Sequence, residues 1–115
     1  MNLLDTDVII EMLRKKKYEG GAISFITLIE ILRGVEAKKR PKVKRLLEES
    51  FTLLNIDNET IETYCTLYGK LRQEGTPIPE ADLLIAATAI AHNLPLKTVD
   101  EHFERLKTYG LKTTT

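Results

Sequence analysis

Four carboxylates in this 115-residue chain stand where a side chain could do chemistry. Asp5 and Asp100 each directly follow a predicted strand, and Glu30 and Asp82 each fall in the first turn of a predicted helix. Most of the other acids lie near lysines, which is typical of solvated helix faces. The position of these four acids at the ends of predicted strands and the starts of helices makes them the candidate site.

Four acids in one crevice would repel each other, and several could not ionise together without a compensating cation. The repulsion predicts a raised pKa for at least one of them when no metal is bound. Carboxylate-rich sites suit Mg²⁺ or Mn²⁺, and such an ion can activate water and stabilise the leaving oxygen of a phosphodiester. The sequence has no His or Cys set with zinc spacing and no glycine pattern for a nucleotide. These observations favour metal-assisted hydrolysis of a phosphodiester.

Ordinary structural roles compete with this interpretation for the two acids that follow strands. Asp5 could cap a helix, although Asp7 lies nearer the helix proper and is the better cap candidate. Asp100 could cap the short helix that follows it. Taken singly, neither acid distinguishes the two roles.

The two helix acids have ordinary explanations as well. Thr27 and Glu30 have the spacing of a capping box, in which Glu30 would reach back to the backbone amide of Thr27. Asp82 could complement the dipole of its helix, an effect worth about 0.3–1 kcal/mol. That helix is apolar on nearly every side, however, and Glu80 could serve the dipole instead.

The elements that must position these acids alternate along the chain. Apolar runs and turn residues predict strands at residues 2–4, 22–24, 51–56, 96–99 and 111–113, and helices at 8–13, 27–35, 41–49, 59–74, 80–92 and 100–106. Asn58 is expected to cap the longest helix. Such alternation predicts a three-layer α/β/α fold with a central, mostly parallel sheet of four to five strands. In that fold all four acids map to one edge of the sheet, where ligands bind.

Four segments of the chain carry a resemblance to a known family. They are Leu3-Leu4-Asp5-Thr6-Asp7, Ser24 to Gly34, Asp82 to Ala89, and Thr98-Val99-Asp100-Glu101-His102-Phe103. In this order and over almost the whole chain, they resemble the PIN-domain nucleases, and among these the VapC-type toxins of toxin–antitoxin pairs.

The resemblance implies a Mg²⁺- or Mn²⁺-dependent endoribonuclease that acts on RNA, forms a homodimer and is inhibited by a small VapB-like antitoxin. It assigns the acidic site to Asp5, Glu30, Asp82 and Asp100. Asp5, Asp82 and Asp100 would hold the metal, while Glu30 would complete its shell or orient the attacking water. The residues expected to support the site through their hydroxyl groups are Thr6 and Thr98. Glu101 stands beside Asp100, so the identity of the fourth acid stays open at this point.

Three other functions fit parts of the sequence. Asp5-Thr6-Asp7 resembles the D-x-D pair of haloacid-dehalogenase phosphatases, with Ser24 in the place of a second motif, although the short chain and Glu30 argue against that class. A receiver domain for phosphotransfer signalling needs an aspartate after the third strand, and Asp57 lies near that place. A catalytically idle PIN-like module would bind RNA without cutting it.

Length, charge and cysteine content indicate the general class of protein. The length suits one domain, taken as residues 1–115, and the formal net charge of zero neither indicates nor excludes a nucleic-acid partner. A single cysteine, Cys65, and the lack of a signal-peptide pattern or membrane span predict a cytoplasmic protein. The basic runs 14–17 and 38–45 could contact phosphates, although solvated helix ends explain most of such residues. His102 lies close to Asp100 in sequence and is a weak candidate for touching substrate.

Overall fold

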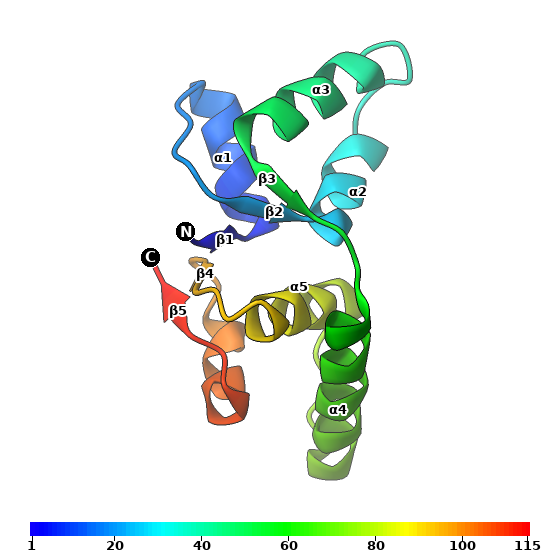
Figure 1. Cartoon of the computed structure of the whole chain (residues 1–115), viewed down its shortest axis with the longest axis vertical. Helices are drawn as coiled ribbons and strands as arrows, with labels where there is room; N and C mark the ends of the chain where they lie inside the picture. The colour runs from blue at the N-terminus through cyan, green and yellow to red at the C-terminus, as the bar shows by residue number, and fades with distance from the viewer.

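The computed structural model describes residues 1–115 and has the expected α/β layers (Figure 1). The strands are β1 (Leu3–Leu4), β2 (Ala22–Ser24), β3 (Thr52–Leu54), β4 (Leu96–Lys97) and β5 (Thr113–Thr114). The helices are α1 (Thr6–Lys15), α2 (Phe25–Arg33), α3 (Arg40–Ser50), α4 (Asn58–Glu74), α5 (Glu80–Ala91) and the 3₁₀ helix η1 (Glu101–Tyr109). No helix is long and apolar enough to span a membrane.

All five strands are parallel and lie in the order β3-β2-β1-β4-β5. The strand β1 is therefore central, and the residue that follows it emerges in the middle of one sheet edge. Leu3 pairs with Ala22 on one side and with Leu96 on the other, and Leu4 pairs with Lys97. This register places the residues after β1 and β4 next to each other.

Two hydrophobic layers cover the sheet, because successive strand residues point to opposite faces. Leu4 and Ile23 belong to the layer that packs against α1, α2 and α3. Leu3 and Ala22 belong to the layer that packs against α4, α5 and η1. In Figure 1 the two groups of helices lie above and below the strands. The predicted three-layer fold is thus confirmed.

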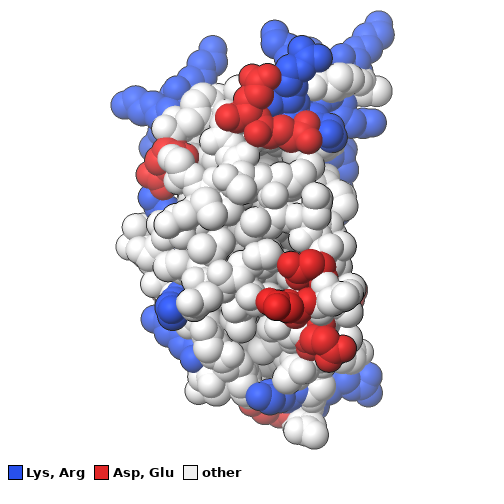
Figure 2. Space-filling model, in the orientation of Figure 1, with Lys and Arg blue, Asp and Glu red and all other residues white.

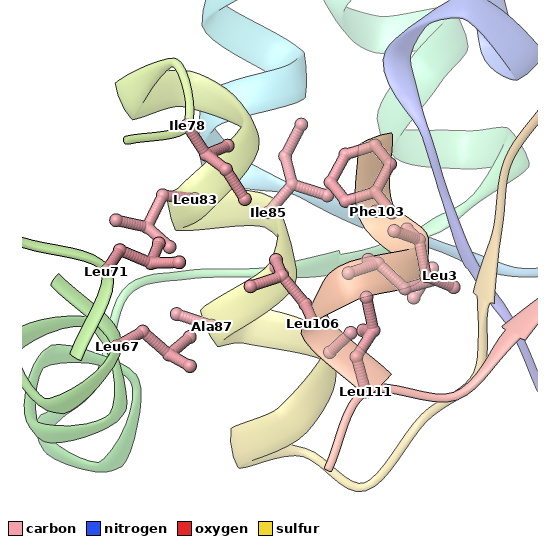
Figure 3. Close-up of a cluster of buried hydrophobic side chains, with 14 residues drawn as sticks. Leu3, Leu67, Leu71, Ile78, Leu83, Ile85, Ala87, Phe103, Leu106 and Leu111 are labelled. Atoms are coloured by element: carbon pink, nitrogen blue, oxygen red, sulfur yellow. The ribbon is translucent and has the colours of Figure 1, made fainter. Parts of the chain in front are cut away.

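The second layer fixes the elements that carry two of the candidate acids. Figure 3 shows Ile85 of α5, Phe103 and Leu106 of η1, and Leu3 of β1 within this one cluster. All four side chains are completely buried. Because α5 and η1 share one packed layer, the first turn of α5 and the start of η1 are held close together.

Several expected boundaries were wrong by a few residues. Asp57, not Asn58, caps α4, and its side chain accepts a hydrogen bond from the backbone amide of Thr60. The helix α2 begins at Phe25, two residues before the expected start, because Ser24 is its N-cap. The strand β5 begins two residues later than its expected start and includes Thr114, one residue beyond the expected end.

Candidate active site

Asp5 leaves the centre of the sheet and is almost completely buried, with 4% of its surface exposed. It is the N-cap of α1, and its Oδ1 accepts a hydrogen bond of 2.8 Å from the amide of Thr6. Its Oδ2 accepts a second hydrogen bond of 2.7 Å from the hydroxyl of Thr98. The expectation that Asp7 would cap this helix was wrong. Asp5 itself caps the helix, and each of its two carboxylate oxygens accepts a hydrogen bond.

The pKa of Asp5 is raised above its ordinary value of 3.8. Burial is the largest cause, and the charges of Asp82 and Asp7 add to it, while the hydrogen bonds from Thr98 and Thr6 oppose it. A raised pKa among the acids was predicted from the sequence, but as a result of mutual repulsion. The structure assigns the larger part to loss of water around the carboxylate, which penalises its charged form.

Because the pKa of Asp5 is raised, the free energy of unfolding of the metal-free chain should depend on pH. Folded Asp5 binds a proton more tightly than unfolded Asp5, so the carboxyl contributes most stability below pH 3.8 and loses that contribution as pH rises through the folded pKa. We therefore expect Asp5→Asn to be more stable than the parent at pH 7, and the difference to shrink toward pH 4. Urea unfolding of both proteins in EDTA across this range measures it. A difference that stays constant with pH would contradict the raised pKa.

Thr98 ties Asp5 to Asp100. It follows β4, which pairs with β1, and the amide of Asp5 donates to the carbonyl of Lys97 at 3.0 Å. The hydroxyl of Thr98 donates to Asp5 and accepts a hydrogen bond of 3.0 Å from the amide of Asp100. The two acids expected after strands are therefore joined by a single buried threonine.

Glu30 reaches the same edge from α2. Its Oε1 accepts a hydrogen bond of 2.8 Å from the hydroxyl of Thr6, which also contacts the hydroxyl of Thr27 at 2.9 Å. The capping box was wrong, because the amide of Thr27 donates to Ser24 and Glu30 does not turn back to its own helix. An ion pair of 3.8 Å with the largely exposed Arg33 is the other polar contact of Glu30. Thr6 thus connects the first two candidate acids.

The last two acids meet through a histidine. Nε2 of His102 lies 2.8 Å from Oδ2 of Asp82, and Nδ1 lies 2.6 Å from Oδ1 of Asp100. Asp100 is also the N-cap of η1 and accepts from the amide of His102 at 3.2 Å. Glu101, the other candidate for the fourth acid, is exposed and makes no such contact. Asp100 is the acid of this pair that faces the other candidates.

The structure brings the candidate residues together in one network of hydrogen bonds. It runs from Glu30 through Thr6 to Asp5, then through Thr98 to Asp100 and through His102 to Asp82. The side chains do not converge as a ready metal cage, since no three His, Cys, Asp or Glu side chains are arranged to hold an ion. The donor set nevertheless fits a hard divalent cation, because all four acids offer carboxylate oxygens at one edge.

Some residues of this hydrogen-bond network were not predicted from the sequence. Ser24 and Thr27 are completely buried and link α2 to Thr6, but their signal, a Ser followed three residues later by Thr, marks only a helix start. His102 was considered and not favoured. Its contact with Asp82, twenty residues away, has no signature in the sequence.

The surface beside the acids is hollowed. A depression of about 540 Å³ lies along α1, and its lining includes Val8, Met12, Lys17 and Val99. Val99, which is 74% exposed, stands between Thr98 and Asp100 and so joins this depression to the acidic edge. A longer ligand than a single ion could therefore lie across the site.

The comparisons decide the family. The sequence profile of the PIN domain matches residues 3–109. The chain belongs to the PIN-domain family. It is 43% identical over 114 residues to the ribonuclease VapC1 of Methanocaldococcus jannaschii, covering 96% of this chain and 84% of that one. This PIN domain has the same fold as VapBC-1 from nontypeable Haemophilus influenzae, with a TM-score of 0.81 at 23% identity over 98% and 96% of the two chains.

A third comparison concerns a toxin–antitoxin system. The structure of VapBC-5 from Mycobacterium tuberculosis, a member of the VapBC family of such systems, matches with a TM-score of 0.70 at 26% identity. The match covers 98% of this PIN domain and 94% of that chain.

Two alternatives from the sequence lose their support. Asp57, the candidate phosphoacceptor of a receiver domain, caps α4, and its pKa is lowered chiefly by its hydrogen bonds from Thr60. Asp7, the second acid of the D-x-D pair, lies exposed in the first turn of α1. Membership in the PIN family accounts for Asp5 without either chemistry.

Proposed function

We propose that this PIN domain, taken as residues 1–115, is a cytoplasmic Mg²⁺- or Mn²⁺-dependent endoribonuclease and the toxin of a VapBC-type pair. The network that joins Asp5, Glu30, Asp82 and Asp100 at one sheet edge carries the proposal. The identity of 43% with a chain named as a ribonuclease supports RNA as the substrate.

Asp5, Asp82 and Asp100 would hold the cation. When bound, the ion would neutralise the acids and stabilise the negative charge on the scissile phosphate. Asp5 is the best oriented of the three. Its two oxygens are oriented by Thr6 and Thr98, so little freedom remains to be lost when it acts.

Glu30 would orient the attacking water. Its side chain is 20% exposed, so one carboxylate oxygen can accept from a water molecule while the other is fixed by Thr6. The support given by Thr6 and Thr98 is therefore positional. Thr98 donates its hydroxyl proton to Oδ2 of Asp5, and Thr6 donates its hydroxyl proton to Oε1 of Glu30.

The RNA would extend from the acids along α1. The depression beside the site includes Lys15 and Lys17, and Figure 2 shows lysines and arginines at the end of the molecule that carries α1 and α3. The ten residues of α1 span about 15 Å, so these basic groups would contact phosphates several nucleotides from the cleaved bond. Arg14 and Lys15 pair with Glu11, whereas Lys16 and Lys17 make no ion pair, and of these two Lys17 lines the depression.

A VapB-like antitoxin and a second copy of the chain are the proposed partners. The similarity to VapBC-5 supports the antitoxin. Exposed apolar side chains on α4 offer a surface for one of the two partners, because Ile61 and Tyr68 are 43% and 45% exposed and Cys65 lies between them. Tyr64 stacks on Tyr68 beside this surface and donates its hydroxyl to Glu80, which raises the pKa of Tyr64 to about 12.

The function is tested by incubating structured and single-stranded RNAs with the purified chain in Mn²⁺ or in EDTA. We expect endonucleolytic fragments in Mn²⁺ and intact RNA in EDTA. RNA that is bound but not cut in Mn²⁺ would favour the idle binding module and overturn the proposal.

A further inference from the structure

His102 fills the space between two of the proposed metal ligands. Its Nε2 lies 2.8 Å from Asp82 and its Nδ1 lies 2.6 Å from Asp100, so both ring nitrogens are engaged by carboxylates. An ion shared by Asp82 and Asp100 would have to stand between the same two groups. Mg²⁺ sits about 2.1 Å from its oxygen ligands, which leaves no room for the ring in the same place.

The ring is held in this position by its own helix. The amide of His102 donates to Asp100 at 3.2 Å, and the ring stacks on Phe103 with centroids 4.8 Å apart and planes 25° apart. Phe103 is completely buried in the layer beneath (Figure 3). The His102 side chain itself is 34% exposed, so the ring borders solvent and can turn outward without disturbing that layer.

We propose that His102 and the divalent cation compete for Asp82 and Asp100. Without the ion, His102 holds the two carboxylates in place of the metal. When the ion binds, the ring turns toward solvent and the carboxylates close on the metal. This inference rests on the proposed function, since it takes Asp82 and Asp100 as metal ligands, and it explains why the acids meet at one edge without forming a ready cage.

The consequence is that His102 weakens metal binding. An ion must break both contacts of the ring before it gains the two carboxylates, and contacts to charged groups are stronger than neutral hydrogen bonds. We expect His102→Ala to bind Mn²⁺ roughly ten times more tightly than the parent, which corresponds to about 1.4 kcal/mol. Asp82 and Asp100 remain in the variant, so the ligands themselves are unchanged.

The chain offers a matched control for this measurement. It has two histidines, and the other, His92, lies 3.2 Å from Asp57 at the start of α4, outside the acidic network. Free Mn²⁺ is measured by electron paramagnetic resonance during titration of the parent, His102→Ala and His92→Ala, with no RNA present. The inference predicts tighter binding by His102→Ala alone.

The other possible results of the Mn²⁺ titration contradict either this inference or the proposed function. Weaker Mn²⁺ binding by His102→Ala would show that the ring is a ligand, and equal binding would show that it does not compete; both overturn the inference. A parent that binds no Mn²⁺ at millimolar concentration would count against the proposed function itself, because His102 cannot compete with an ion that has no site.

A second measurement avoids any substitution. With ¹⁵N-labelled histidine, the imidazoles of His102 and His92 give separate signals, and Mg²⁺ is added to the parent protein. We expect the His102 signals to move to the positions of a solvent-exposed ring while those of His92 stay fixed. His102 signals that do not respond while Mg²⁺ binds would contradict the competition.

Discussion

Replacement of Asp5 by asparagine is expected to lower the rate of RNA cleavage at least about a thousandfold, because several kcal/mol of charge stabilisation by the metal depend on this carboxylate. The fold should be retained. An asparagine oxygen can still cap α1 by accepting from the amide of Thr6, and the asparagine NH₂ group can donate to the hydroxyl oxygen of Thr98. Initial rates of cleavage of one RNA in Mn²⁺, with circular dichroism of both proteins, provide the measurement.

Asp7→Asn is the matched control for this variant. Asp7 lies two residues further along the chain and is the same residue type, but it is exposed in the first turn of α1 and makes no hydrogen bond with the network. We expect its rate to stay within about threefold of the parent, as for a surface charge near the substrate. Equal losses in both variants would mean that general charge at this edge, and not the buried carboxylate, controls cleavage.

Mn²⁺ is expected to raise the thermal stability of the chain substantially. An ion that binds only the folded chain at about 100 times its dissociation constant adds about 2.7 kcal/mol. For a chain of this size that raises Tm by roughly 10 °C. Calorimetry or a dye-based melt at increasing Mn²⁺ measures the shift, with Ca²⁺-free buffer and EDTA as the reference.

The same melts carry their own control. Glu104 is an acid at the exposed surface of η1 that pairs with Lys107 and lies outside the network, so Glu104→Gln should keep the full shift. Asp82→Asn should lose most of it. A shift that survives in Asp82→Asn would indicate that Mn²⁺ binds elsewhere on the chain.

The layers of the fold could be predicted from the sequence because its patterns are strong. The apolar residues around Leu3–Leu4 and Ala22–Ser24 are short runs between polar segments, and both become strands of the sheet. Glu80–Ala91 is apolar on nearly all sides and becomes the most buried helix, α5. When strands and helices alternate, a parallel sheet places the chain after each strand at one edge. The sequence therefore predicted that the four acids lie at the same edge.

Local caps could not be predicted in the same way. Asp5 and Asp7, Ser24 and Thr27, and Asp57 and Asn58 are pairs of good capping residues within three positions of each other. Propensity ranks the members of each pair almost equally, so the choice depends on where the preceding strand or loop ends. In each case the earlier residue caps the helix.

Contacts between single side chains that lie far apart in the chain could not be predicted from the sequence either. The hydrogen bond between Thr6 and Glu30 joins residues 24 positions apart, and that between Asp5 and Thr98 joins residues 93 positions apart. The position of His102 between Asp82 and Asp100 depends on how η1 packs against α5. Such contacts follow from packing, which only the folded chain specifies.

If acids that lie far apart in sequence share one cation, the amount of Mn²⁺ bound per chain depends on each of them. Equilibrium dialysis of the parent, Asp5→Asn, Asp82→Asn and Asp100→Asn at one Mn²⁺ concentration gives the occupancy of each. We expect strong binding by the parent and a marked loss in every one of the three variants, although the residues lie far apart in sequence. Full occupancy in any two of them would contradict a shared site.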